Sequence, residues 1–233
     1  MASNPNYGVV TEEIRRLAAL TQENSCINPD DYVRYDVKRG LRDLNGKGVV
    51  AGLTEISDIV AKQVVNGESV PCEGKLYYRG INVEDLVQGV LKEGRYGFEE
   101  TAYLLMLGQL PNEAQLREFR GQLSYYRTLP NNFVRDIILK APSRDIMNSL
   151  ARSVLNLASY DEDADDISLP NVMRQCLQLL AVFPMLAVYG YQAYNYKSGS
   201  SLYIHAPQPE HSTAESILAL LRPDSAYSYW EAH

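Results

Sequence analysis

Apolar residues recur at helical spacing through most of this chain, and the helices they predict begin and end at clear signals. One apolar run stops at Gly108, with Pro111 just beyond it, which is a common way for a helix to end. Asn82 and Ser212 each precede a periodic run and are suitable N-cap residues. The pattern predicts helices over Glu12–Gln22, Val83–Leu91, Phe98–Leu107, Glu113–Tyr126, Phe133–Leu139, a segment that Ser143 caps (with Ile146, Met147, Leu150, Val154 and Leu157 on one face), Val172–Tyr194, the segment from Ser212 to Leu221, and a last short helix that Arg222-Pro223-Asp224 opens.

Two short runs in the first third of the chain follow the pattern of strands instead. Val49–Ile59 and Lys75–Tyr78 are rich in β-branched or aromatic residues, and Asn66-Gly67 and Pro71 lie between them. These runs predict a small antiparallel element. Since helices are predicted elsewhere, the expected fold class is all-α, mostly α-helical, with a small N-terminal β-hairpin.

The longest predicted helix, Val172–Tyr194, is apolar nearly all round, so we expect it in the middle of the fold. Pro184 removes one backbone donor inside this helix and should kink it. The apolar part, Cys176–Tyr194, is interrupted by polar residues and is too short to cross roughly 30 Å of hydrocarbon. We therefore predict a buried core helix here.

Charge and cysteine content narrow the classes of partner and compartment. The chain has 233 residues and a formal net charge of −7, which disfavours nucleic acid and anionic lipid as partners. Its three cysteines are far apart and form neither a disulfide framework nor a metal set. No signal peptide is visible at the N-terminus. These features predict a soluble protein of a reducing, intracellular compartment, without nucleic-acid or membrane partners.

Two loops suggest ligand sites at first sight. The acidic run 161–166 resembles the first half of a calcium-binding loop, but Asp166 stands where glycine is required and Val172 where a bidentate glutamate is required. We interpret it as a solvated loop. The glycine-rich segment Gly40–Lys47 has the wrong spacing for a nucleotide-hydrolase loop. Two interpretations remain open for its basic residues, a solvated loop or a site for a phosphate-bearing cofactor; these residues are Lys38, Arg39, Arg42 and Lys47.

The three histidines do not form a recognisable active site. His205, His211 and His233 have no second histidine, cysteine or carboxylate at metal-ligand spacing. The sequence also gives none of them a partner that would orient it as a general base. We expect surface or structural histidines, no catalytic residue and no metal site.

Several short segments, taken in order, are more informative than any single motif. The ordered set, which runs from about Asp36 to Asp224, resembles the citrate synthase family and in particular its bacterial branch. The segments are Gly40–Val49, Gly52–Ser57, Gly74–Ile81, Asn82–Leu86, Phe98–Leu105, Gly108–Pro111, Ser159–Asp161 and Phe183–Met185.

The resemblance implies an acyltransferase of the tricarboxylic acid cycle that condenses acetyl-CoA with oxaloacetate. It implies a cytoplasmic, mostly α-helical homodimer that has no permanently bound cofactor and takes a CoA thioester as substrate. Residues 1–35 would form an N-terminal helical segment, and residues 36–233 the first part of the family's large domain. Arg42 matches an arginine that lies near the CoA phosphates in the family, and this is the one binding role that we transfer.

The resemblance also predicts that the catalytic histidines, aspartate and clamping arginines of the family lie beyond the segment present here. The small domain and C-terminal helices would be absent too, so we expect this polypeptide to be inactive alone. A 2-methylcitrate synthase remains open as an alternative. A second alternative is a non-catalytic helical interaction protein with the same fold. Continuation of the reading frame into histidine motifs would exclude this second alternative.

Overall fold

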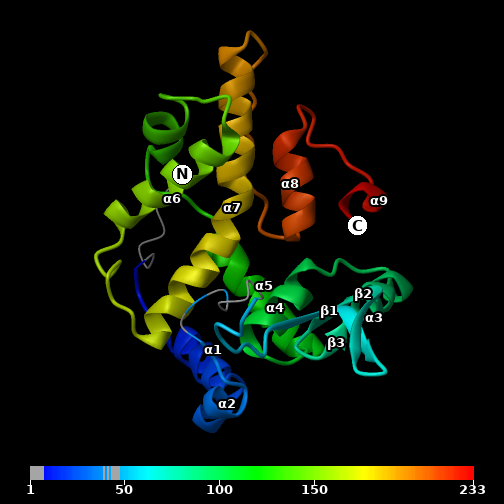
Figure 1. Cartoon of the computed structure of the whole chain (residues 1–233). Coiled ribbons are helices and arrows are strands. Elements are labelled where there is room, and N and C mark those ends of the chain that lie inside the picture. The colour runs from blue at the N-terminus through cyan, green and yellow to red at the C-terminus, as the bar shows by residue number, and fades with distance from the viewer. Residues whose placement is uncertain (1–7, 39, 41, 43–47) are drawn as a thin grey trace. The chain divides into compact units, whose positions relative to one another are not determined.

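The computed structural model describes residues 8–38, 40, 42 and 48–233 (Figure 1). Its described part is mostly helical with one small antiparallel sheet, which confirms the predicted fold class. The elements are α1 (Glu12–Glu23), α2 (Pro29–Arg34), β1 (Ser57–Val65), β2 (Glu68–Tyr78), β3 (Ile81–Asn82), α3 (Val83–Glu93), α4 (Phe98–Leu107), α5 (Glu113–Tyr126), the π-helical turn η1 (Val134–Ile138), α6 (Ile146–Leu157), the 3₁₀ turn η2 (Ala158–Tyr160), α7 (Leu169–Lys197), α8 (Thr213–Leu221) and α9 (Tyr229–Ala232).

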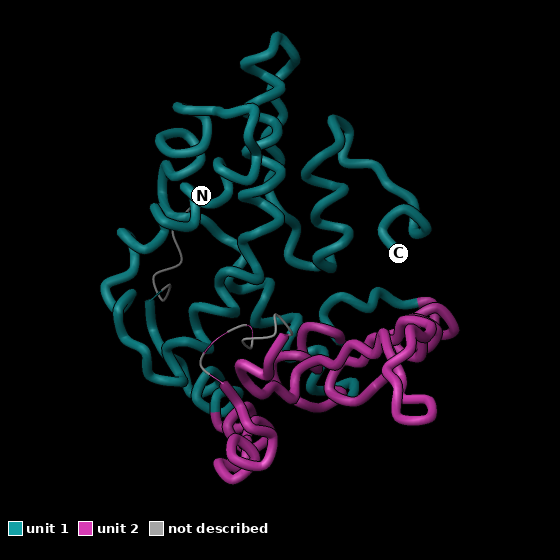
Figure 2. The backbone as a smooth tube through the Cα atoms, in the orientation of Figure 1, with its two compact units in different colours: residues 1–18, 95–100, 111–233 teal, residues 19–94, 101–110 magenta. Residues whose placement is uncertain are grey.

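The chain divides into two compact units (Figure 2). Unit 1 comprises residues 95–100 and 111–233 together with the described residues up to Ala18. Unit 2 comprises residues 19–94 and 101–110. The boundary therefore falls inside α1 and α4, and the chain passes between the units more than once.

Unit 1 is a helical bundle around α7, which packs against α5, α6 and α8. About half of the 29 residues of α7 are buried, including the polar Arg174 and Gln178. Among the described residues, α7 alone is long and apolar enough to cross a membrane by length and composition, and its burial is that of a core helix. Pro184 lies inside it, and the helix bends along its course in Figure 1, as an internal proline predicts.

The core of unit 1 forms where α7 meets its neighbours. The cluster combines large side chains from η1, α6, α7 and α8, so one face of each element is removed from water. Phe133 and Val182 are fully buried there, at 0% exposure. The other buried members are Leu129, Ile138, Leu157, Met185, Leu186, Val188, Tyr189, Ala193 and Leu220.

Unit 2 holds the sheet, in the order β1-β2-β3. Asn66 and Gly67 connect β1 to β2 with φ of 53° and 83°, the left-handed backbone that a two-residue hairpin turn needs. Val65 therefore pairs with Glu68, and the ladder runs back to Ser57 opposite Tyr78. Most of β1 is exposed on both faces.

The Tyr-Arg-Gly segment after β2 has a structural role in unit 2. Arg79 donates from Nη2 to the carbonyl oxygen of Leu105 at 3.0 Å and to Ser25 Oγ at 3.1 Å. Asn24 Nδ2 donates to the carbonyl oxygen of Leu107 at 2.9 Å. The bonds to Leu105 and Leu107 satisfy carbonyls at the C-terminal end of α4, which a helix leaves unpaired.

Local signals located most helices correctly. The bounds of α4 and α5 are those predicted, and Asn82 caps α3 by accepting the N–H of Glu84. Ser212 caps α8 in a capping box with Glu215. The prediction missed α2, although Asn28 caps it and Pro29 opens it.

Four predicted details are wrong. The strands are Ser57–Val65 and Glu68–Tyr78, and not Val49–Ile59 and Lys75–Tyr78, because the Asn66-Gly67 turn fixes which residues pair. Pro71 does not separate strands but lies within β2, next to a register shift. Asp145, and not Ser143, caps α6. The last helix begins at Tyr229 after Ser228, and not at residues 222–224.

Candidate functional site

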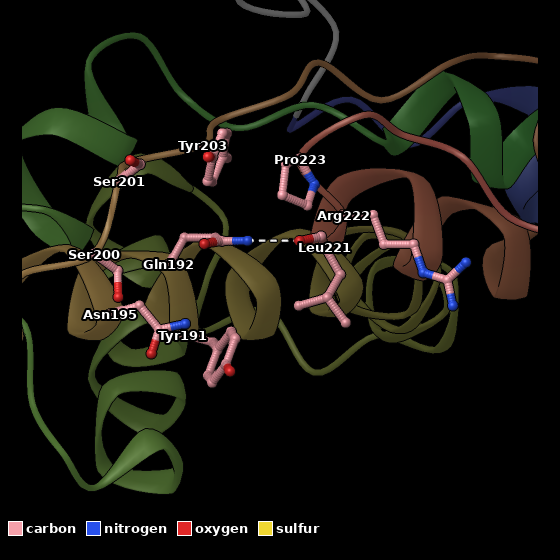
Figure 3. Close-up of a pocket in the computed structure, with 9 residues that line it drawn as sticks. All are labelled: Tyr191, Gln192, Asn195, Ser200, Ser201, Tyr203, Leu221, Arg222 and Pro223. Atoms are coloured by element: carbon pink, nitrogen blue, oxygen red, sulfur yellow. Dashed lines mark hydrogen bonds between the residues drawn. The ribbon is translucent and has the colours of Figure 1, made fainter.

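The connector after α7 forms one wall of an open pocket in unit 1, with a volume of about 510 Å³ (Figure 3). Gln192 Nε2 donates to the carbonyl oxygen of Leu221 at 2.7 Å and thereby holds the end of α8 against α7. Arg222 also lines the pocket, but its guanidinium points away from the other labelled side chains and bonds the carbonyl oxygen of Ala226 and the carboxylate of Glu231. The remaining walls are hydroxyl, amide and aromatic groups, from Tyr191, Asn195, Ser200, Ser201, Tyr203 and Pro223. This pocket has no free charge that could act on a substrate.

A second cavity in unit 1, of about 440 Å³, is richer in ionisable groups. We call it the Glu99 cavity. It is enclosed by the segment leading into α4, by α5 and by the connector and first turn of α8. Its lining residues are Tyr96, Glu99, Arg120, Gly121, Leu123, Ser124, Arg127, Pro209, Glu210, His211, Ser212 and Glu215.

Glu99 is the most deeply buried carboxylate of this cavity, with 1% exposure. Its Oε1 accepts the backbone N–H of Thr213 at 2.6 Å, so it caps the start of α8 from a position 114 residues earlier in the chain. The nearest cation to its Oε2 is the guanidinium of Arg120, at 3.7 Å from Nη2. That separation is an ion pair without a hydrogen bond.

Arg127 is a positioning residue at the base of the cavity and is 5% exposed. Its Nη1 donates to the carbonyl oxygen of His211 at 2.7 Å and to Ser216 Oγ at 2.8 Å. Burial lowers the pKa of Arg127, while the charges of Glu99 and Glu215 act in the opposite direction. The guanidinium therefore fixes the connector before α8 through its Nη1 group.

Glu215 is held in its ionised form by its neighbours. Burial raises the pKa of this carboxyl, but hydrogen bonds from Ser212, Tyr227 and Tyr96 outweigh it and lower the pKa below its usual value. The Ser212 N–H donates to Oε2 at 2.9 Å and the Tyr227 hydroxyl to Oε1 at 3.2 Å. Both oxygens of this glutamate are occupied.

Three other polar atoms of the lining have no hydrogen-bond partner among the described residues. They are Glu99 Oε2, Arg120 Nε and His211 Nδ1, and all three are buried. Buried polar atoms are paired in most native structures, so three such atoms around one cavity require an explanation.

The predicted site residues lie in different places. Arg42 is exposed and forms an isolated antiparallel bridge with Gly48, and its proposed role stays a prediction. Lys38 pairs with Asp36 at 2.6 Å. Arg39 and Lys47, with the rest of the glycine-rich segment at 41 and 43–46, lie outside the described residues.

The histidines differ from one another. His205 is half-buried, accepts the Tyr189 hydroxyl at its carbonyl oxygen at 2.6 Å and stacks its ring near Tyr203. His211 lines the Glu99 cavity with its ring edge-on to Tyr227. Within the part of the chain that the structure describes, no histidine ring hydrogen-bonds a carboxylate, and no group of three His, Cys, Asp or Glu residues could hold a metal ion.

The sequence pattern predicted a solvated loop at 161–166, but one residue of this acidic run is buried. The Asp161 side chain is only 8% exposed and binds Arg174, which is 0% exposed, through both oxygens at 2.9 and 2.7 Å. Asn171 and Gln178 accept two more bonds of the same guanidinium. Asp161 therefore belongs to a buried ion-pair network that anchors the loop to α7.

Comparisons with known proteins agree with this architecture. The family model described as "Citrate synthase, C-terminal domain" matches residues 41–232. A 2-methylcitrate synthase of Corynebacterium glutamicum is 28% identical over 186 residues, which are 80% of this chain and 42% of that protein. A citrate synthase of Saccharolobus solfataricus is 30% identical over 147 residues, covering 63% of this chain and 35% of that protein.

Two solved structures share the fold. The citrate synthase of Pyrobaculum aerophilum matches 78% of this chain and 44% of its own with a TM-score of 0.59 and 23% identity. That of Thermotoga maritima matches 79% of this chain and 41% of its own, with a TM-score of 0.54 and 25% identity. The chain thus spans less than half the length of these relatives. Because the family model covers most of its residues, the chain belongs to the citrate synthase family.

Proposed function

We propose that this chain forms part of the helical scaffold of a citrate synthase, an enzyme that condenses acetyl-CoA with oxaloacetate to give citrate and CoA. The observation that carries the proposal is the family match over residues 41–232. The relative from Saccharolobus solfataricus named citrate synthase supports this choice of substrates. The protein takes the CoA thioester as a substrate and has no permanently bound cofactor.

A 2-methylcitrate synthase is the second candidate, because relatives from Corynebacterium glutamicum carry that name. It would use propionyl-CoA in place of acetyl-CoA, a difference of one methylene. One methylene in an apolar pocket changes kcat/KM by roughly 10–200-fold. Steady-state kinetics of the active enzyme with both thioesters decide between the two, and a kcat/KM ratio in favour of propionyl-CoA overturns the first choice.

For the 233-residue polypeptide by itself, we expect no turnover. Removing a proton from a thioester methyl group needs a placed carboxylate and a partner acid, usually an imidazole. In the described residues no imidazole is hydrogen-bonded to a carboxylate. The test is oxaloacetate-dependent thiol release from acetyl-CoA or propionyl-CoA by the purified chain, and thiol release above a boiled control contradicts the expectation.

Arg42 is proposed to contact the phosphates of CoA from one subunit of a cytoplasmic homodimer. It is exposed, as a residue that meets a soluble cofactor must be. In a CoA titration, Arg42→Ala should weaken binding, while Arg34→Ala is a matched control because Arg34 is exposed in the same unit. Equal affinity of the two variants contradicts the role, and a sedimentation run that gives only monomer contradicts the dimer.

A further inference from the structure

We propose that strand β1 pairs with β1 of a second copy of this chain, so that two three-stranded sheets join into one sheet of six strands. β1 is the edge strand in the order β1-β2-β3, and among the described residues it pairs with β2 alone. An edge strand presents a row of unpaired N–H and C=O groups that another strand can complete. The inference is independent of the condensation reaction, because it concerns assembly and its test uses neither thioester nor oxaloacetate.

Apolar side chains of β1 are left in water. Ile59 is 73% exposed, Val64 75% and Val65 44%. Successive side chains of a strand point to opposite faces, so Ile59 and Val65 lie on one face of the sheet and Val64 lies on the other. A long edge strand with exposed apolar residues is a site at which strands of separate molecules associate.

The partner is a second copy because β1 is complementary to itself. Asp58 and Lys62 are exposed and lie four residues apart, so their side chains are on the same face. When two β1 strands run antiparallel with Val60 opposite Val60, each Asp58 lies opposite Lys62 of the other copy. Opposite charges directly across a strand pair stabilise the pair, and a two-fold axis makes this contact twice. A foreign strand would not require this self-complementary order.

The charges also select one register. With the two-fold axis at Ala61, Asp58 would lie opposite Val64 and Lys62 opposite Val60. With the axis at Lys62 two lysines would face each other, and with the axis at Asp58 two aspartates would, which destabilises the pair. Only the axis at Val60 places both charges opposite a charge of the other sign.

Apolar residues meet in the same register. Ile59 lies opposite Ala61 of the second copy, and the two Val60 side chains lie opposite each other at the axis. Val64 falls opposite Ile56, which directly precedes β1 and is 46% exposed. Aliphatic pairs of this kind remove apolar surface from water on both faces of the joined sheet.

The free edge of β1 is regular enough to pair. Residues 72–74 lie opposite Ala61, because Val60 pairs with Lys75 and Lys62 pairs with Pro71. The additional residues of this irregularity are therefore in β2, and β1 runs without a break over Ser57–Val65. A lysine in an edge strand often prevents pairing between edges, because like charges would meet. Asp58 reverses that effect here.

The experiment measures self-association of the intact chain by sedimentation velocity, over roughly 1–500 µM. Asp58→Lys places like charges opposite each other twice, and Lys62→Asp does the same with the other sign. Each should weaken the association by about tenfold or more relative to the parent. Glu73→Lys is the matched control, since it changes the net charge as Asp58→Lys does but lies on β2, and it should associate like the parent.

A mixture of the two β1 variants is the decisive arm. In a complex of one Asp58→Lys chain with one Lys62→Asp chain, both cross-strand positions again join opposite charges. The equimolar mixture should therefore regain the association that each variant alone has lost. A mixture that stays as dissociated as its components overturns the proposal, and so does equal sedimentation of the parent and Asp58→Lys. A homodimer formed through another surface would persist in every variant, so the two assemblies are distinguishable.

Discussion

Two buried tyrosines of unit 1 allow a matched test of hydrogen-bond energetics. Tyr126 is 0% exposed and Tyr189 is 2% exposed, so both rings are packed alike. The Tyr189 hydroxyl donates to the carbonyl oxygen of His205 at 2.6 Å, whereas the Tyr126 hydroxyl has no partner among the described residues. Replacing either tyrosine by phenylalanine deletes one oxygen, but the expected effects on the free energy of unfolding differ.

The magnitudes follow from what each oxygen loses on folding. An unpaired buried hydroxyl costs roughly 1–3 kcal/mol, so Tyr126→Phe should leave stability unchanged or raise it by about 1 kcal/mol. Tyr189→Phe removes a hydrogen bond and leaves the His205 carbonyl unpaired, so it should lower stability by about 1–3 kcal/mol. The assay is urea unfolding followed by circular dichroism, with the midpoint compared at constant slope. A Tyr126→Phe variant as destabilised as Tyr189→Phe would refute the reasoning.

Alkaline unfolding provides a check on the same residues. Burial raises the pKa of Tyr126 and of Tyr189 to about 12, from the ordinary value of 10.0. A hydroxyl with a raised folded-state pKa gives stability that is complete below pH 10 and is lost as the pH rises through about 12. Each phenylalanine variant should therefore lose less stability than the parent between those two pH values, and a parallel loss would contradict the assignment of burial as the cause.

Three further predictions concern the frame of the fold. Arg174→Met should lower the free energy of unfolding by about 3–5 kcal/mol, because it leaves the buried carboxylate of Asp161 without its cation; a loss below about 1 kcal/mol in urea unfolding would contradict this. Gly108→Ala should lower the free energy of unfolding by about 1–3 kcal/mol, since Gly108 has φ of +80° and a Cβ there would lie 2.6 Å from the Cβ of Asn24. The control Gly89→Ala in α3 should raise it by about 0.5–1 kcal/mol, and equal unfolding midpoints for the two variants would contradict the steric argument. The lowered pKa of Glu215 gives stability that is present above its ordinary value of 4.5 and is lost as the pH falls through the folded-state pKa, so thermal melts at decreasing pH should show a smaller acid loss for Glu215→Gln than for the parent.

Local signals in the sequence were sufficient for most helix boundaries. Gly108 and Pro111 end one helix and Asn112 begins the next, and α4 and α5 have the predicted bounds. These signals act within a few residues, so they can be recognised without knowing the fold. The first strand was misplaced because Val49–Ile59 has strand-forming residues, while pairing is decided by the distance from the Asn66-Gly67 turn.

The candidate site was not predictable in the same way. Glu99 and Thr213 are 114 residues apart, and nothing near either residue indicates the other. Asp161 was assigned to a solvated run because five acidic residues cluster there, and only the packing of α7 selects one of them for burial. Contacts between residues far apart in the sequence therefore determine both the surroundings of Glu99 and the burial of Asp161.

Arg174 and Arg120 show that the ion pairs of unit 1 differ in how completely their hydrogen bonds are satisfied. In the same unit, Arg174 is buried with bonds to Asn171, Gln178 and both oxygens of Asp161. Such a network is complete and contributes to structure alone. The Glu99–Arg120 pair is held at 3.7 Å and leaves an acceptor and a donor unused. The two pairs differ in exposure, because the Arg174 side chain is 0% exposed and that of Arg120 is 41% exposed. Water therefore screens the Glu99–Arg120 pair, and loss of the cation should cost far more free energy of unfolding at Arg174 than at Arg120.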